Sequence, residues 1–150
     1  MTAEVRILGE NDASVLRRVA TDVFDNPVQQ AWAREFLTDP RHHLAVAIDE
    51  ELVVGMASAV HYVHPDKAPE LWINEVGVAA THRGAGIAKR LLAALFERGR
   101  MLGCSEAWVL ADESNTIARR LYESAGGRAA PEPAIMYEFP LASPPPGAAR

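Results

Sequence analysis

The chain has 150 residues, 49% of them hydrophobic, which is typical of one soluble domain with a sizeable core. Acidic residues outnumber basic ones 20 to 15, so no general positive field favours nucleic acid, and a neutral or cationic partner is expected. No apolar run approaches the ~20 residues that cross a bilayer, no secretory signal is visible, and the single Cys104 excludes an internal disulfide, so we expect a cytoplasmic protein without membrane contact.

The first half of the chain predicts a strand, two helices and a β-hairpin. Residues 5–8 form a short β-prone run, and apolar residues between 15 and 24 recur at helical spacing. A second helical stretch begins at Pro27. The runs 44–48 and 52–63 are rich in strand-forming residues and are separated by a short acidic turn, which predicts a hairpin.

The middle of the chain predicts a strand, a glycine turn and a helix. Residues 71–78 form the strand, and 81–86 form a polar turn that contains two glycines. An amphipathic helix follows over 87–102, with Gly103 as its stop signal.

The last third predicts a strand at 107–111, a helix at 114–125 and a final strand at 135–139. This order indicates one α/β domain over 1–142, whose sheet is antiparallel at first and parallel around the central helix. Residues 143–150 are rich in proline and small residues, and we expect a disordered tail.

The glycine turn is a candidate anion site. The helix predicted from residue 87 has free backbone N–H groups and the positive end of its dipole at its first turn, and anions bind readily at such a position. Arg83 and Lys89 add positive charge. An alternative is that the glycines only make a tight turn. A dinucleotide fingerprint is disfavoured because Lys89 occupies its third small position, and no Gly-Lys-Ser/Thr phosphate loop is present.

Two blocks of this sequence resemble the GCN5-related N-acetyltransferase (GNAT) family. The first is Arg83-x-x-Gly86-x-Ala88 at the strand-to-helix turn, and the second is Asn115-x-x-Ala118-x-x-Leu121-Tyr122-x-x-x-Gly126. The resemblance implies a single-domain α/β GNAT fold, with a mixed sheet of about six to seven strands flanked by about four helices.

That resemblance also implies that acetyl-coenzyme A is the acetyl donor. Its pyrophosphate would lie on the glycine turn, and its pantetheine arm would pair with the edge of the preceding strand. The expected cofactor-binding residues are Val76, Gly77, Val78, Arg83, Gly84, Ala85, Gly86, Ile87, Ala88, Lys89, Asn115 and Ala118.

The resemblance assigns Tyr122 as the general acid that protonates the leaving thiolate. Helical geometry places Asn115, Ala118 and Tyr122 on one stripe, although a core aromatic is the alternative reading of Tyr122. An acceptor amine with a pKa of about 10 must lose a proton before it attacks. In related enzymes this strand lies beside the thioester, so the resemblance implies that Glu75 is the best-placed base; a solvated strand carboxylate is the alternative.

Within the family, residues 70–78 and the acidic pair 112–113 look like the aminoglycoside 3-N-acetyltransferases of the type I group. A polycationic acceptor needs several carboxylates around its cleft. The expected substrate-binding residues are Glu70, Asp112, Glu113, Asp25 and Glu35. An acidic solvated surface is the alternative.

Other acceptors stay open, namely polyamines, small-metabolite amines and peptide N-termini. A non-catalytic acyl-CoA sensor and a plain interaction domain are further alternatives. We expect no metal site, because no Cys, His and Asp grouping has convincing ligand spacing. By the habit of the family, a homodimer is the expected assembly.

Overall fold

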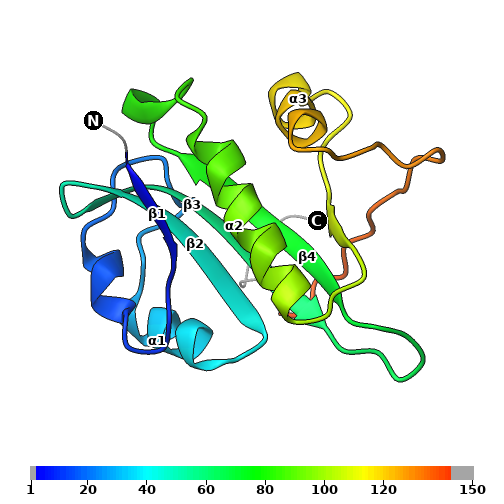
Figure 1. Cartoon of the computed structure of the whole chain (residues 1–150), viewed down its shortest axis with the longest axis horizontal. Coiled ribbons are helices and arrows are strands. Elements are labelled where there is room, and N and C mark those ends of the chain that lie inside the picture. The colour runs from blue at the N-terminus through cyan, green and yellow to red at the C-terminus, as the bar shows by residue number, and fades with distance from the viewer. Residues whose placement is uncertain (1–2, 143–150) are drawn as a thin grey trace, which may run out of the picture.

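The computed structural model describes residues 3–142 as a mixed sheet with helices on both faces (Figure 1). In chain order the elements are β1 (Glu4–Ile7), the 3-10 helix η1 (Ala13–Arg17), α1 (Gln30–Thr38), β2 (His42–Asp49), β3 (Leu52–Tyr62), β4 (Glu70–Val78), the 3-10 helix η2 (Ala80–His82), α2 (Ile87–Met101), β5 (Ala107–Val109) and α3 (Thr116–Ser124). None of these helices combines the length and the apolar character that a bilayer crossing requires.

The strand order within the described residues is β1-β2-β3-β4-β5. Neighbours from β1 to β4 are antiparallel, whereas β4 and β5 are parallel. The predicted α/β class and the change from antiparallel to parallel pairing are therefore confirmed. The sheet has fewer strands than the expected six to seven, and the described residues form three α-helices rather than about four.

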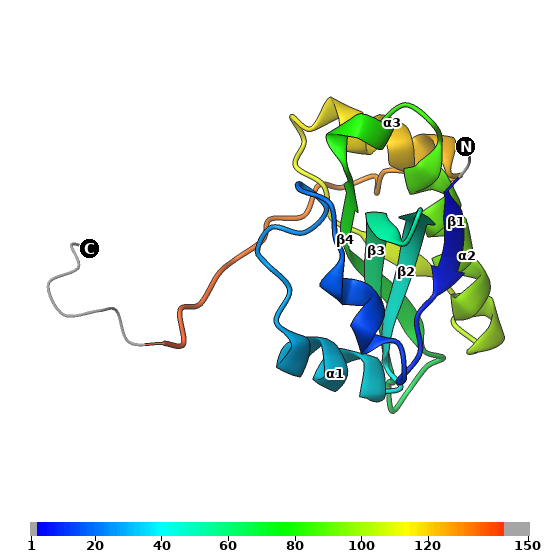
Figure 2. The ribbon, with the colours of Figure 1, turned by 90° about the vertical axis from the view of Figure 1, so that its left-hand side faces the viewer.

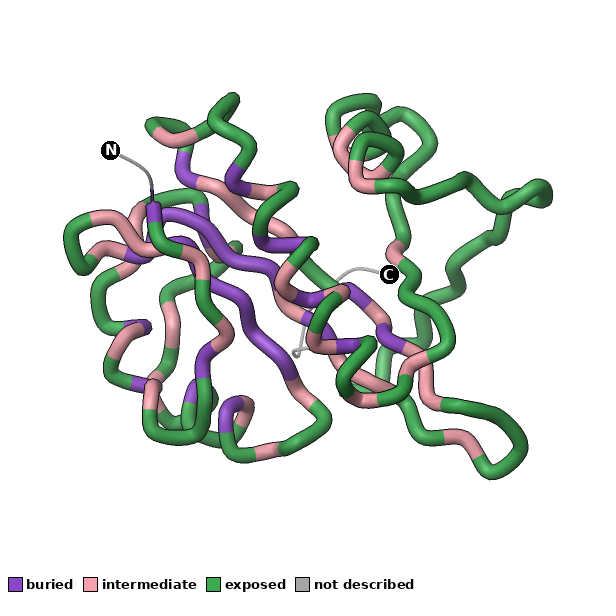
Figure 3. Tube along the Cα trace, in the orientation of Figure 1, coloured by how far each residue is buried: buried purple, intermediate pink, exposed green. Residues whose placement is uncertain are grey.

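The core lies between the sheet and the helices of both faces. Helix α2 covers one face, while η1 and α1 lie against the other (Figure 2). The α2 residues Leu91, Leu92 and Leu95 are fully buried. Strand β2 is buried over five consecutive residues because both of its faces are covered (Figure 3).

The predicted helix over residues 15–24 is wrong except for its first turn, which forms η1. Beyond that turn the backbone pairs with the sheet instead. The Val53 N–H donates to the Arg18 carbonyl, and the Ala20 N–H donates to the Val53 carbonyl. Pairing with β3 satisfies these groups in place of helical hydrogen bonds, which the local apolar spacing could not reveal.

The predicted final strand at 135–139 is also wrong. Residues 129–142 form no helix or strand and are exposed throughout (Figure 3). The strand predicted at 107–111 is shorter, and the helix predicted from Ser114 begins after its cap, Asn115. The predicted tail at 143–150 lies outside the described residues.

A bulge in β4 sets the direction of the residues that follow it. Leu71 and Ile73 alternate onto the buried face. The register then pairs Ala59 with Ile73 and Ser58 with Glu75, which leaves Asn74 as an extra residue. With strict alternation Glu75 would share the buried face of Ile73. The bulge turns its carboxylate out of the core instead, so Glu75 is exposed.

Gly77 allows another segment to cross β4. A Cβ atom at this position would lie 2.2 Å from the carbonyl oxygen of Val23, in the segment between η1 and α1. Val23 is itself buried. The absence of a side chain at position 77 is therefore what lets this segment lie directly against the strand.

We expect Gly77→Ala to lower the free energy of unfolding by about 1–3 kcal/mol, because the added methyl must displace the Val23 backbone. Denaturant unfolding followed by circular dichroism measures this change. Gly9→Ala is the matched control, since the nearest atom to its added Cβ would be 3.6 Å away. Equal stability of the two variants would show that the crossing is not tightly packed.

Candidate active site

The glycine turn before α2 presents an open, unobstructed helix start. Gly84 and Gly86 have φ angles of 79° and 77°, in the left-handed region that favours glycine. No side chain caps α2 at Gly86, and a Cβ at either glycine would meet nothing within 4 Å. The first N–H groups of α2 therefore remain available to an anion.

Side chains hold this turn against the sheet. His82 hydrogen-bonds to Asp49 at the β2–β3 hairpin (2.7 Å) and to Thr81 (2.8 Å). The Arg83 Nε donates to the Val78 carbonyl (3.0 Å), which leaves the rest of its guanidinium group free. These hydrogen bonds hold the turn in place beside the sheet. Of the predicted cofactor-binding residues next to the turn, Ile87 has its side chain buried in the core, and Lys89 is exposed on the first turn of α2.

A free strand edge lies next to the turn. The pairing of β4 with β5 covers only three residue pairs and ends at Ile73 and Val109. Beyond that point no described strand pairs with the β5 side of β4, so residues 76–78 have an open edge. An extended arm with amide groups could pair there, as expected for pantetheine.

This edge lines a cavity of about 720 Å³, called here the donor cavity. Val76, Gly77 and Val78 form its strand side, and Arg83 lies at the glycine turn. Its wall also includes four carboxylates, Asp22, Asp25, Glu75 and Asp112. The cavity therefore brings together predicted residues of β4, Arg83 from the turn, and Asp112 and Asn115 from the segment before α3.

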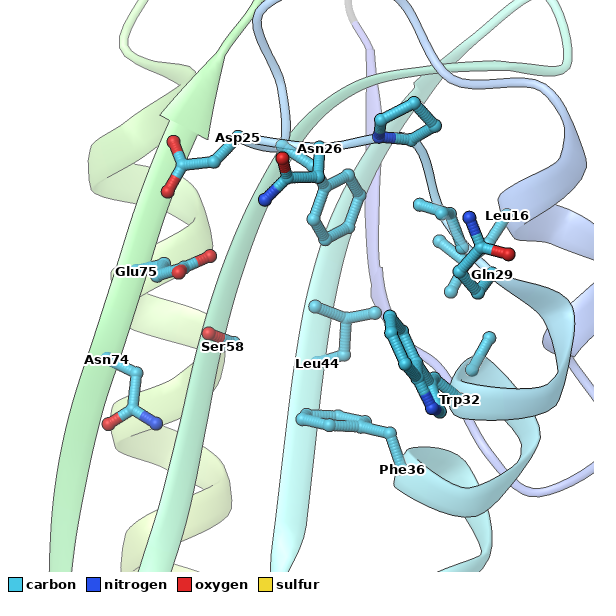
Figure 4. A pocket seen from close by; sticks show the side chains of 14 residues that line it. Leu16, Asp25, Asn26, Gln29, Trp32, Phe36, Leu44, Ser58, Asn74 and Glu75 are labelled. Carbon is cyan, nitrogen blue, oxygen red and sulfur yellow. The ribbon is translucent and has the colours of Figure 1, made fainter. Parts of the chain in front are cut away.

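A second cavity, of about 410 Å³, lies on the α1 side of the sheet and is called here the acceptor cavity. Trp32 and Phe36 line it from α1, facing Leu44 and Ser58 on the sheet (Figure 4). Asp25, Asn74 and Glu75 line both cavities. The two cavities therefore meet at a small polar group that contains two carboxylates.

Helix α3 carries Asn115 and Tyr122. The Asn115 Oδ1 accepts a hydrogen bond from the Ala118 N–H (3.1 Å), so this side chain caps the helix while also lining the donor cavity. Tyr122 is half-buried, packs against the core and is not among the residues lining either cavity. Burial raises the pKa of its hydroxyl, which keeps the group protonated at neutral pH.

Three predicted substrate residues do not line either cavity. Glu70 begins β4, five residues from Glu75, with its carboxylate near His64. Glu35 is on the exposed side of α1, and the Glu113 side chain is exposed before α3. Of the five predicted acids, only Asp25 and Asp112 line a cavity.

Several residues that line the cavities have no clear local signal in the sequence. Asp22 lies in a loop where the sequence predicts a helix, and its φ of 68° is not helical. The sequence pattern therefore does not indicate that Asp22 lines the donor cavity. Asn74 reaches both cavities through the bulge, which has no local sequence signal. Trp32 and Phe36 fall within the helical stretch predicted from Pro27, and their spacing of four residues puts both on one face of that helix.

Known proteins resemble this chain in sequence over most of its length. The model of the Acetyltransferase (GNAT) family matches residues 13–127. The uncharacterized N-acetyltransferase YycN of Bacillus subtilis is 33% identical over 91 residues, which are 60% of this chain and 58% of YycN. The mycothiol acetyltransferase of Thermomonospora curvata is 32% identical over 143 residues, 88% of this chain and 45% of that protein. The chain thus spans about half the length of these curated relatives.

Solved structures show the same fold. Aminoglycoside N-acetyltransferase AAC(6')-Iy in complex with coenzyme A has a TM-score of 0.74 and 22% identity, covering 91% of this chain and 94% of that one. The structure of AAC(6')-Iy in complex with a bisubstrate analogue has a TM-score of 0.76 and 22% identity, and the match covers 93% of this chain and 99% of that one. Because the family match extends over most of its length, this chain belongs to the GNAT acetyltransferase family.

Proposed function

We propose that the protein transfers the acetyl group of acetyl-coenzyme A directly to a primary amine of a small cationic molecule. The observation that carries this proposal is the junction of the donor and acceptor cavities at Asp25, Asn74 and Glu75. A donor held along β4 and an amine held beside α1 would meet at that junction. Two reactants fixed in contact react far faster than two free ones.

The residues at the donor cavity suit coenzyme A. The open α2 start at Gly86 offers N–H groups to a pyrophosphate, and Arg83 offers a cation beside it. The free edge of residues 76–78 offers backbone groups to the pantetheine amides. AAC(6')-Iy, which shares the fold, has been solved with coenzyme A.

In the proposed reaction, Glu75 accepts a proton from the acceptor ammonium, directly or through water. The freed amine nitrogen forms a bond to the acetyl carbon, and the carbon–sulfur bond breaks. Tyr122, whose hydroxyl burial keeps protonated, gives that proton to the departing sulfur. A backbone N–H near Val76 would stabilise the negative charge on the carbonyl oxygen.

For the acceptor we propose an aminoglycoside, acetylated at its 3-N position. Asp25 and Glu75 line the acceptor cavity as well as the donor cavity, and two carboxylates there suit a molecule that carries ammonium groups. The rings of Trp32 and Phe36 provide an apolar wall against which sugar rings could pack. AAC(6')-Iy has been solved with a bisubstrate analogue of coenzyme A and acetylneamine.

A thiol-release screen tests this function, using acetyl-CoA with aminoglycosides, polyamines and peptides in parallel. We expect the highest kcat/KM with an aminoglycoside, and mass spectrometry with NMR of the product to place the acetyl group on the 3-amine. Faster turnover of a polyamine or peptide would reassign the acceptor. Binding of coenzyme A without thiol release from any amine would support an acyl-CoA sensor instead.

We expect Glu75→Gln to lower kcat about 10²- to 10⁴-fold, because a general base is lost. Steady-state kinetics with saturating acetyl-CoA measures this loss. Glu70→Gln is the matched control on the same strand; it lies outside both cavities and should retain wild-type kinetics. Equal losses in the two variants would contradict the role of Glu75.

Tyr122→Phe should lower kcat with little change in the Kd for acetyl-CoA, since only the proton donor is removed. Gly86→Val should mainly weaken acetyl-CoA binding, because a β-branched residue resists the left-handed φ of 77° at the helix start. Isothermal titration calorimetry and steady-state kinetics separate the two effects. The division of roles fails if both variants change both parameters equally.

A further inference from the structure

Three stacked aromatic rings lie on the surface of the sheet. Trp72 of β4 stacks on Trp108 of β5, with ring centroids 4.9 Å apart, and on Tyr62 of β3, with centroids 5.8 Å apart. The ring planes are inclined by only 11° and 20°. Trp108 and Tyr62 are 36% and 37% exposed, and none of the three belongs to the hydrophobic core of the described residues. These three residues, called here the aromatic row, therefore present large rings that the fold does not bury.

The aromatic row lies on the α1 side of the sheet. Leu71 faces the other side, because a Cβ atom added to Gly99 of α2 would lie 3.2 Å from the Leu71 side chain. Successive strand residues point to opposite faces, so Trp72 points away from α2. On the α1 side the helix lies over β2, where Phe36 stacks on His42 (Figure 2). The row occupies the part of that face that belongs to β4 and β5.

The aromatic row continues the acceptor cavity along the sheet. Ser58 and Asn74 line that cavity. Val60 is the next residue of β3 on the same face as Ser58, and it pairs with Trp72. Trp72 precedes Glu75 by three residues, a distance of about 10 Å along a strand. A ligand with its reacting amine at Glu75 and a further ring in the direction of Trp72 therefore spans both.

The chemistry of the aromatic row suits a sugar ring that carries ammonium groups. The faces of Trp and Tyr rings offer apolar area and attract cations. Glu106 shares the face of Trp108, two residues away, because its carbonyl accepts a ladder hydrogen bond from β4. At the Tyr62 end, the Glu70 carboxylate lies 3.7 Å from the His64 ring. The free acid of the row is thus at its β5 end, where it would attract a cation and repel an anion.

We propose that the aromatic row binds an outer sugar ring of an aminoglycoside whose reacting amine lies at the junction of the donor and acceptor cavities. This inference rests on the proposed function and adds a second binding position to it. Contacts about 10 Å from the reacting atoms hold substrate and transition state equally. The row therefore lowers the KM of acceptors that have this ring and leaves kcat unchanged.

Isothermal titration calorimetry tests the aromatic row with coenzyme A present and no acetyl group available. The probes are a two-ring and a three-ring aminoglycoside that share the two inner rings. We expect Trp72→Ala to raise the Kd of the three-ring compound about 10-fold, through loss of the ring stacking and cation–π contact. The Kd of the two-ring compound should stay as in wild type, and Trp72→Phe should restore most of the lost affinity.

Met101→Ala is the matched control. Met101 is 72% exposed at the end of α2, on the opposite side of the sheet, and its loss should change neither Kd. Trp108→Ala removes a more exposed ring of the row and should weaken the three-ring compound in the same way. Circular dichroism checks that each variant is folded, and Trp108→Ala carries the test if Trp72→Ala is not.

Equal weakening of both compounds, or no weakening of either, overturns the aromatic row as a binding position. These results leave acetyl transfer intact if thiol is released from acetyl-CoA. Conversely, a Trp72-dependent Kd without thiol release supports the row and contradicts the proposed acetyl transfer. No binding of either aminoglycoside overturns both the row and the proposed acceptor.

Discussion

The extra residue in β4 decides how this site is built. Without the bulge at Asn74, Glu75 would continue the buried row of Leu71 and Ile73 beneath α2. An unpaired carboxylate there would cost several kcal/mol or would take up a proton. The bulge instead places the charge beside open space, where two cavities meet. The acid at that junction therefore depends on one irregular pair of strands.

The second constraint on the site is that β4 and β5 separate after Ile73 and Val109. A continuous ladder would satisfy the backbone of residues 76–78 within the sheet, and no extended ligand could pair with it. Because the ladder ends at Ile73, those groups border the donor cavity together with Arg83. The adjacent glycine turn is held by the His82–Asp49 hydrogen bond, so strand edge and helix start keep a fixed relation.

Local signals predicted the parts of the fold that local interactions determine. The β2–β3 hairpin, the glycine turn and α2 with its Gly103 stop all follow from periodicity and turn residues close in sequence. The bulge and the crossing over Gly77 depend on contacts between distant segments, so no short pattern announces them. The helix predicted at 15–24 does not form for the same reason, because the backbone of Arg18 and Ala20 hydrogen-bonds to Val53 of β3.

The two cavities are lined by parts of the chain that contribute differently to the core. The donor side uses the strand and the turn that flank the main core, whereas much of the acceptor wall comes from residues 24–36, in the loop and helix on the opposite face. Substitutions in that stretch disturb few of the contacts that hold sheet and α2 together. Under the proposed function, the preference for one amine over another could therefore change through substitutions in that stretch without altering the residues of the donor side.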